Sequence, residues 1–124
     1  MIRDDYITYL DLYEAEPLFD RMKEVSEFLW ELHERGGLNT DFAELPMTVP
    51  YHIPCHLRSL GIGFPAIDLM NLIPGLTVKE LGTYCCGMAG TFSVYYYDLS
   101  KKIADKKIAN IVSTGADIVV TDCP

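Results

Sequence analysis

Short segments of strand character alternate with helix-length segments along most of this 124-residue sequence. Three segments rich in β-branched and aromatic residues lie at 47–53, 77–81 and 117–122. Apolar residues at helical spacing lie between them, at 64–73 and 97–113. Such alternation is typical of βαβ units. We therefore predict an α/β fold, with a parallel sheet built from βαβ units and helices on both faces.

Three details refine this prediction. Apolar residues line one face of a further predicted helix at 16–35, which we expect to end at Gly36-Gly37 and to cover one face of the sheet. Pro50 has no N–H to donate, so the strand at 47–53 should be an edge strand or pair only through its second half. The helix at 97–113 should turn a lysine-rich face to solvent.

Charge and composition exclude several classes of function. The chain has 18 acidic and 10 basic residues, and its net charge of −8 repels phosphate, so nucleic acid is not an expected partner. No apolar run approaches the roughly 20 residues of a spanning helix, and acidic residues occupy the N-terminus where a secretory signal is apolar. We predict a cytoplasmic protein with no transmembrane segment. No catalytic set, phosphate loop or dinucleotide fingerprint is present, so no catalytic residue and no turnover of its own are expected.

The four cysteines follow the predicted strands. Cys55 comes after the first strand, Cys85 and Cys86 after the second, and Cys123 after the third. Because the carboxyl ends of parallel strands lie along one edge of a sheet, all four thiols should converge there. The cytosol keeps thiols reduced, which favours ligands or redox groups over structural disulfides. For any one cysteine taken singly, simple packing remains the alternative.

The spacing of these cysteines carries a resemblance to a known family. About 30 residues separate Cys55 from the Cys85-Cys86-Gly87 triplet, and slightly more separate the triplet from Cys123. The chain thereby resembles the cysteine-rich CCG domain found in the B subunit of heterodisulfide reductase and in related electron-transfer subunits. Within that family, residues 51–92 and the closing VVTDCP look like the second such domain in the C subunit of anaerobic glycerol-3-phosphate dehydrogenases.

The match is incomplete at one end of the motif. The last cysteine of the family's C-P-x-C would fall two positions beyond Pro124, and the helix and strand that the family adds after it are absent as well. We therefore expect residues 1–124 to form a single CCG-type domain, truncated at its C-terminus and belonging to a longer multi-domain chain.

The resemblance implies a metal centre held by thiolates. Its ligands would be Cys55, Cys85, Cys86 and Cys123, and the metal group of the intact protein would be an iron–sulfur cluster of the 4Fe–4S type, with zinc as the alternative. Because residues 1–124 lack one of the family's cysteines, we expect the site to be incomplete or empty in this part of the protein alone. Two adjacent cysteines can face one centre only in a bend, and we expect Gly87 and Gly90 to permit it and to bring N–H groups close to sulfur. A vicinal disulfide or two unconnected thiols is the other interpretation of the pair.

Polar neighbours of Cys55 are ambiguous. His52 and His56 are expected to donate hydrogen bonds near the ligands or to cap a helix, with direct zinc ligation as the alternative. Arg58 would balance the negative charge of thiolates or lie in solvent.

The resemblance also implies a function. The chain would be an electron-transfer module that receives electrons from a flavin-containing dehydrogenase subunit and passes them towards a quinone. N-terminal iron–sulfur domains of the same chain would be further partners, and the complex would associate peripherally with the inner face of the membrane. The alternative is a structural or interaction domain that binds zinc or no metal.

Overall fold

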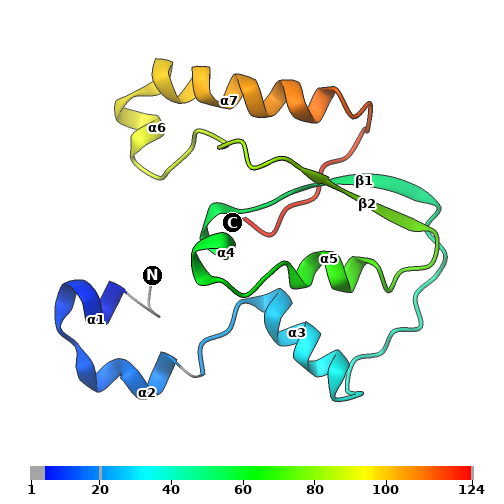
Figure 1. The fold of residues 1–124 in the computed structure, drawn as a ribbon, viewed down its shortest axis with the longest axis horizontal. Helices are drawn as coiled ribbons and strands as arrows, with labels where there is room; N and C mark the ends of the chain where they lie inside the picture. The colour runs from blue at the N-terminus through cyan, green and yellow to red at the C-terminus, as the bar shows by residue number, and fades with distance from the viewer. Residues whose placement is uncertain (1–4, 20, 124) are drawn as a thin grey trace. The chain divides into compact units, whose positions relative to one another are not determined.

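The structure is a computed structural model that describes residues 5–19 and 21–123 (Figure 1). The chain divides into two compact units, Met1–Leu38 and Asn39–Pro124, which are taken in turn. The first unit is helical. Its elements are α1 (Asp5–Leu10), the short 3-10 helix η1 (Tyr13–Ala15), α2 (Glu16–Phe19) and α3 (Val25–Glu34).

The prediction of one continuous helix at 16–35 is wrong, because the segment is split before Val25. Glu24 has extended backbone angles and acts as the N-cap of α3: its carboxylate accepts the N–H groups of Ser26 and Glu27. The Glu27 carboxylate accepts the Glu24 N–H in return. This reciprocal capping box satisfies N–H groups that a helix start leaves unpaired, so it favours a new start at Glu24. The helix ends before Gly36-Gly37, as predicted.

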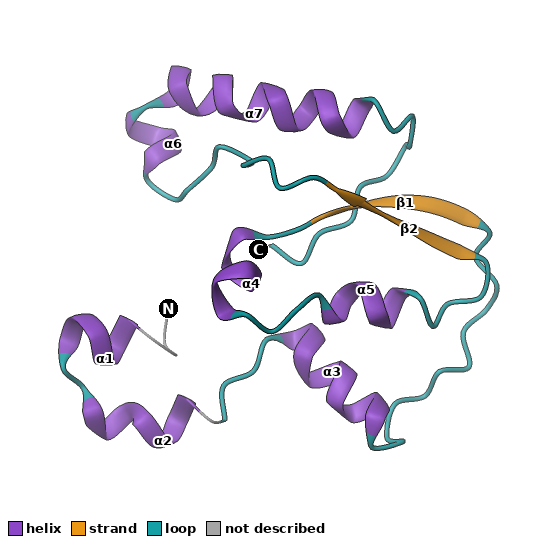
Figure 2. Ribbon diagram, in the orientation of Figure 1, coloured by secondary structure: helices purple, strands orange, loops and turns teal. Residues whose placement is uncertain are grey.

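The second unit is a mixture of strands and helices (Figure 2). Strands β1 (Met47–His52) and β2 (Leu76–Leu81) pair in parallel along their whole length. Two short helices, α4 (Cys55–Leu60) and α5 (Pro65–Met70), connect them, and α6 (Phe92–Tyr95) and α7 (Tyr97–Val112) follow β2. In Figure 1, α7 lies above the strand pair, and α4 and α5 lie below it. The structure thus confirms an α/β fold with parallel strands.

The sheet has two strands in the described part of the chain, so it differs from the prediction at the third strand. Pro50 lies in the middle of a strand that pairs throughout, and its carbonyl accepts the Val120 N–H at 2.9 Å on the side away from β2. In this two-stranded sheet β1 is an edge strand, as predicted, and on its other side it meets the segment around Val120. That segment is not a full strand, because it meets β1 only in a bridge between Tyr51 and Val120. Ile118 is exposed, so burial of its side chain contributes little to pairing the rest of this segment with β1.

The core of the second unit lies at β1 and the elements beside it. Tyr51, Leu57 and Leu81 are almost completely buried, and Val49 and Ile53 are buried next to them. Burial of such side chains is the main stabilising contribution in a domain of this size. No helix in the described part of the chain has the length and apolar character needed to cross a membrane.

Candidate metal centre

All four cysteines line one small cavity of about 40 Å³ in the second unit. They arrive from three separate parts of the chain, and the full lining is His52, Ile53, Cys55, Arg58, Tyr84, Cys85, Cys86 and Cys123. The thiols therefore meet at one place, as the strand order predicts. Their role as metal ligands remains a prediction. All four are free thiols, so the structure contains no disulfide between them.

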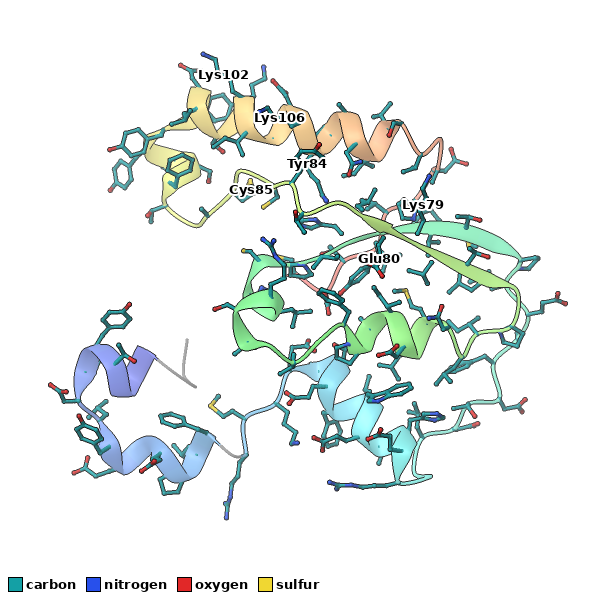
Figure 3. All side chains as sticks on the ribbon, viewed as in Figure 1. Lys79, Glu80, Tyr84, Cys85, Lys102 and Lys106 are labelled. Atoms are coloured by element: carbon teal, nitrogen blue, oxygen red, sulfur yellow. The ribbon has the colours of Figure 1, made fainter. Side chains whose placement is uncertain are left out.

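Local structure explains how each thiol reaches the cavity. Cys55 is the first residue of α4 and follows the extended Pro54, which turns the chain from β1 into the helix. Cys85 and Cys86 lie on the loop that follows β2, where Figure 3 labels Tyr84 and Cys85. Cys123 comes three residues after the Val120 bridge to β1. Each cysteine thus follows a segment whose backbone is hydrogen-bonded in the sheet or to β1.

The cysteine pair lies in a bend that a glycine makes possible. Gly87 has φ of +83°, which L side chains rarely adopt, and its N–H donates to Cys85 Sγ at 3.3 Å. A Cβ atom at Gly87 would lie 2.5 Å from the Ser100 carbonyl oxygen in α7. The prediction of an N–H group directed at sulfur is thus confirmed for Gly87. Gly90 is exposed and, among the described residues, does not line the cavity.

Helix α7 holds both ends of the cysteine loop. The Ser100 hydroxyl donates to the Gly87 carbonyl at 2.7 Å, and Lys107 Nζ donates to the Gly82 carbonyl at 2.9 Å. Both side chains are buried, so the prediction that the lysines of this helix face solvent is wrong for Lys107. Seven positions, about two helical turns, separate the two residues, which places them on the same face of α7.

A partly buried hydrogen bond connects the Cys123 segment to β1. Tyr51 Oη donates to Asp122 Oδ1 at 2.6 Å, and the Tyr51 side chain is fully buried. Burial raises the pKa of the Cys123 thiol, and the negative charges of Cys86, Cys55 and Asp122 raise it further. This electrostatic interaction between thiols follows from their convergence on one cavity.

His52 and Arg58 line the cavity, whereas His56, among the residues described, does not. His52 Nδ1 is buried and has no hydrogen-bond partner within the described part of the chain. Burial lowers the pKa of His52, and the positive charge of Lys107 lowers it further. A neutral imidazole beside four thiols leaves a nitrogen able to pair with whatever occupies the cavity.

The donor set fits a thiolate-bound metal. Thiolates are the protein ligands that zinc and iron–sulfur clusters favour, and imidazole is a further zinc ligand. The side-chain geometry is less complete: within the described ranges, no three His, Cys, Asp or Glu side chains are arranged to hold a metal ion. The backbone thus brings the donors together without fixing a coordination shell.

Comparison with known proteins agrees with this arrangement of cysteines. The CCG family of cysteine-rich domains matches residues 49–124, which include all four cysteines. The chain belongs to this family. No solved structure matches the chain.

Two kinds of named protein are similar to this chain. The C subunit of the anaerobic glycerol-3-phosphate dehydrogenase of Escherichia coli K12 is 35% identical over 124 residues, which cover 98% of this chain and 31% of that protein. Lactate utilization protein A of Macrococcus caseolyticus is 38% identical over 113 residues, which cover 88% of this chain and 45% of the relative. The same-named protein of Bacillus cytotoxicus is 34% identical over 113 residues. The chain thus spans less than half the length of these relatives.

Sequence reasoning missed the buried contacts of α7. Ser100, Ala104 and Lys107 share the face that also carries Ile103 and Ile111, so a lysine falls within the apolar stripe of this helix. That position is the signal that could have identified Lys107, because a lysine in a buried register requires a partner.

Proposed function

We propose that this CCG domain is an electron-transfer module of an oxidoreductase complex. Cys55, Cys85, Cys86 and Cys123 would hold an iron–sulfur centre of the 4Fe–4S type. In this function a flavin-containing dehydrogenase subunit donates electrons, which pass towards a quinone. Oxidation of one reduced flavin releases two electrons, and reduction of one quinone to quinol takes up the same two electrons with two protons.

The observation that carries the proposal is the convergence of all four cysteines on one cavity. Three segments far apart in the sequence contribute the thiols, and packing alone does not require that arrangement. The Gly87 N–H that donates to Cys85 Sγ supports the same function, because hydrogen bonds to sulfur tune the reduction potential of a bound cluster.

The named relatives supply the context of the proposed complex. One is called a subunit of a glycerol-3-phosphate dehydrogenase, and this chain covers 31% of it. We therefore propose that a dehydrogenase subunit and further iron–sulfur domains are the partners, and that the complex works in the cytoplasm at the inner face of the membrane.

Zinc binding is the second candidate function, and the lining of the cavity supports it. His52 lies among the four cysteines, and imidazole together with thiolates is a common zinc ligand set. A zinc ion held by the same cysteines would stabilise the fold and carry no electrons, because zinc has no redox chemistry in proteins. The domain would then be a structural or interaction module.

Anaerobic reconstitution of the protein with iron and sulfide tests the choice. An iron–sulfur centre should give broad visible absorption, stoichiometric iron and sulfide, and bleaching on reduction. Cys86→Ser should abolish the colour, because it removes a central ligand. Thr91→Ala is the control and should reconstitute like the wild type, because Thr91 is exposed.

The outcomes separate the two candidates. A colourless chain that retains stoichiometric zinc through gel filtration supports the structural function and contradicts electron transfer. Full iron content in Cys86→Ser would show that the cysteine pair is not part of the centre.

A further inference from the structure

Lys107 is the most unusual buried side chain near the cavity. Lys107 is only 3% exposed. Lys102 and Lys106 lie on the same helix (Figure 3), and Lys106 in particular is exposed to solvent. The Lys107 Nζ donates to the Gly82 carbonyl at 2.9 Å. A lysine that is placed in the interior loses the solvation of its ammonium group, so the surrounding structure must compensate for that loss.

The hydrogen bond to Gly82 holds the positive charge of Lys107 at the cysteine loop. Among the described residues, no carboxylate forms an ion pair with Lys107. Burial lowers the pKa of Lys107, Cys86 acts in the opposite direction, and Arg58 lowers it further. The Lys107 ammonium group is held at Gly82, on the loop that carries Cys86, so a metal-bound thiolate at Cys86 would lie near a buried positive charge.

The hydrogen bonds of α7 enclose the cysteine loop. Lys107 holds Gly82 at the start of the loop, and Ser100 holds Gly87 at its end. Cys85 and Cys86 lie between these two anchors. Ser100 and Lys107 are about two helical turns apart on α7, so a single helix binds both ends of the loop.

We propose that Lys107 is a positioning residue for the metal centre: it fixes the loop 82–87 at Gly82, and it places a buried positive charge beside Cys86 that balances an anionic metal–thiolate centre. The charge role depends on the proposed function, because it requires metal-bound thiolates. The role in fixing the loop does not.

The test compares Lys107→Met with Lys106→Met in the full chain, after circular dichroism has shown that both fold. Hydrogen exchange of the metal-free, reduced protein reports the loop. Exchange in a peptide spanning 83–90 should be about fivefold faster in Lys107→Met, as expected for the loss of one hydrogen bond. Lys106→Met should exchange like the wild type, because Lys106 is exposed.

The affinity for metal tests whether the positive charge of Lys107 supports the thiolate centre. Zn²⁺ binding, measured in competition with a chromophoric chelator, should weaken by about tenfold or more in Lys107→Met, as it does when groups that support metal ligands are removed. Lys107→Arg keeps the charge and should recover most of the affinity. Lys107→Gln keeps an N–H donor but no charge, so it would recover the affinity only if the role of Lys107 were purely structural. If Lys107→Met does not fold, Lys107→Gln removes the charge but keeps an N–H donor, and the same loss of affinity is expected.

The outcomes decide each part of the proposal. Unchanged exchange at 83–90 in Lys107→Met overturns the positioning role. Equal Zn²⁺ affinity in Lys107→Met and Lys106→Met overturns the charge role. A wild-type protein that binds neither Zn²⁺ nor an iron–sulfur centre overturns the thiolate centre and the charge role together, while the exchange data still decide whether Lys107 holds the loop.

Discussion

Substitution of Gly87 by alanine tests how closely α7 approaches the cysteine bend. The added Cβ would lie 2.5 Å from the Ser100 carbonyl oxygen and 3.1 Å from the Ala104 nitrogen, both of which are backbone atoms within a helix. Neither atom belongs to a flexible side chain, so the bend or the helix must move. The φ angle of +83° adds strain, because an L side chain rarely adopts it.

Two contributions set the expected loss of unfolding free energy in Gly87→Ala. Left-handed backbone costs a non-glycine residue about 1–2 kcal/mol. Inserting a methyl group into a well-packed contact costs about 1–3 kcal/mol. The expected loss of unfolding free energy is therefore about 2–5 kcal/mol, a large part of the roughly 5–15 kcal/mol that a domain has.

Urea unfolding followed by circular dichroism measures the loss, and Gly90→Ala is the matched control. Gly90 also has positive φ, at +56°, but no atom lies within 4 Å of the position that its Cβ would take. Gly90→Ala should lose only about 1–2 kcal/mol, from backbone strain alone. Equal losses in the two variants would refute the close approach of α7 to the cysteine bend.

Two further predictions concern the walls of the cavity. Tyr51→Phe removes the hydrogen bond to Asp122 and should lower the free energy of unfolding by about 1.5–3 kcal/mol. Tyr95→Phe is the control and should change this free energy by less than about 0.5 kcal/mol, because Tyr95 is exposed. Equal changes in the two variants would rule out a stabilising Tyr51–Asp122 hydrogen bond. The pKa of His52 is lowered from its ordinary 6.5 by burial and by Lys107, so the unfolded state takes up the proton first as the pH falls. Stability should be fully present above about pH 6.5 and should decrease below it, and His52→Gln should lessen that decrease in the urea midpoint, whereas His56→Gln should retain it. An unchanged acid dependence in His52→Gln would contradict this assignment.

Much of the second unit could be predicted from local sequence patterns. β1, β2 and α7 lie within a residue or so of the predicted segments, because alternation, β-branched residues and helical spacing act between near neighbours. The convergence of the cysteines was predictable for a related reason. Once the strands are parallel, the segments that follow them share one edge of the sheet.

Other features required contacts between distant segments. The break before α3 depends on Glu24 competing as a cap against continuation of the helix, and apolar periodicity does not report that competition. Pro50 correctly predicted that β1 lies at an edge of the sheet, but only the folded structure shows that its carbonyl accepts the Val120 N–H. The predicted third strand is only a bridge at Val120, because a segment with strand-forming residues also needs a neighbouring strand to pair with along its length.

The order of the sequence was enough to place four cysteines beside strand ends and to restrict the chain to an α/β fold, since both depend on the spacing of residues along the backbone. The burial of Lys107, the contact between Ser100 and Gly87, and the orphan nitrogen of His52 emerged only when separate elements packed together. The physical reason is distance in the chain: α7 approaches the cysteine loop through backbone atoms that no local pattern connects, and the resulting desolvation and hydrogen bonding exist only in the folded unit.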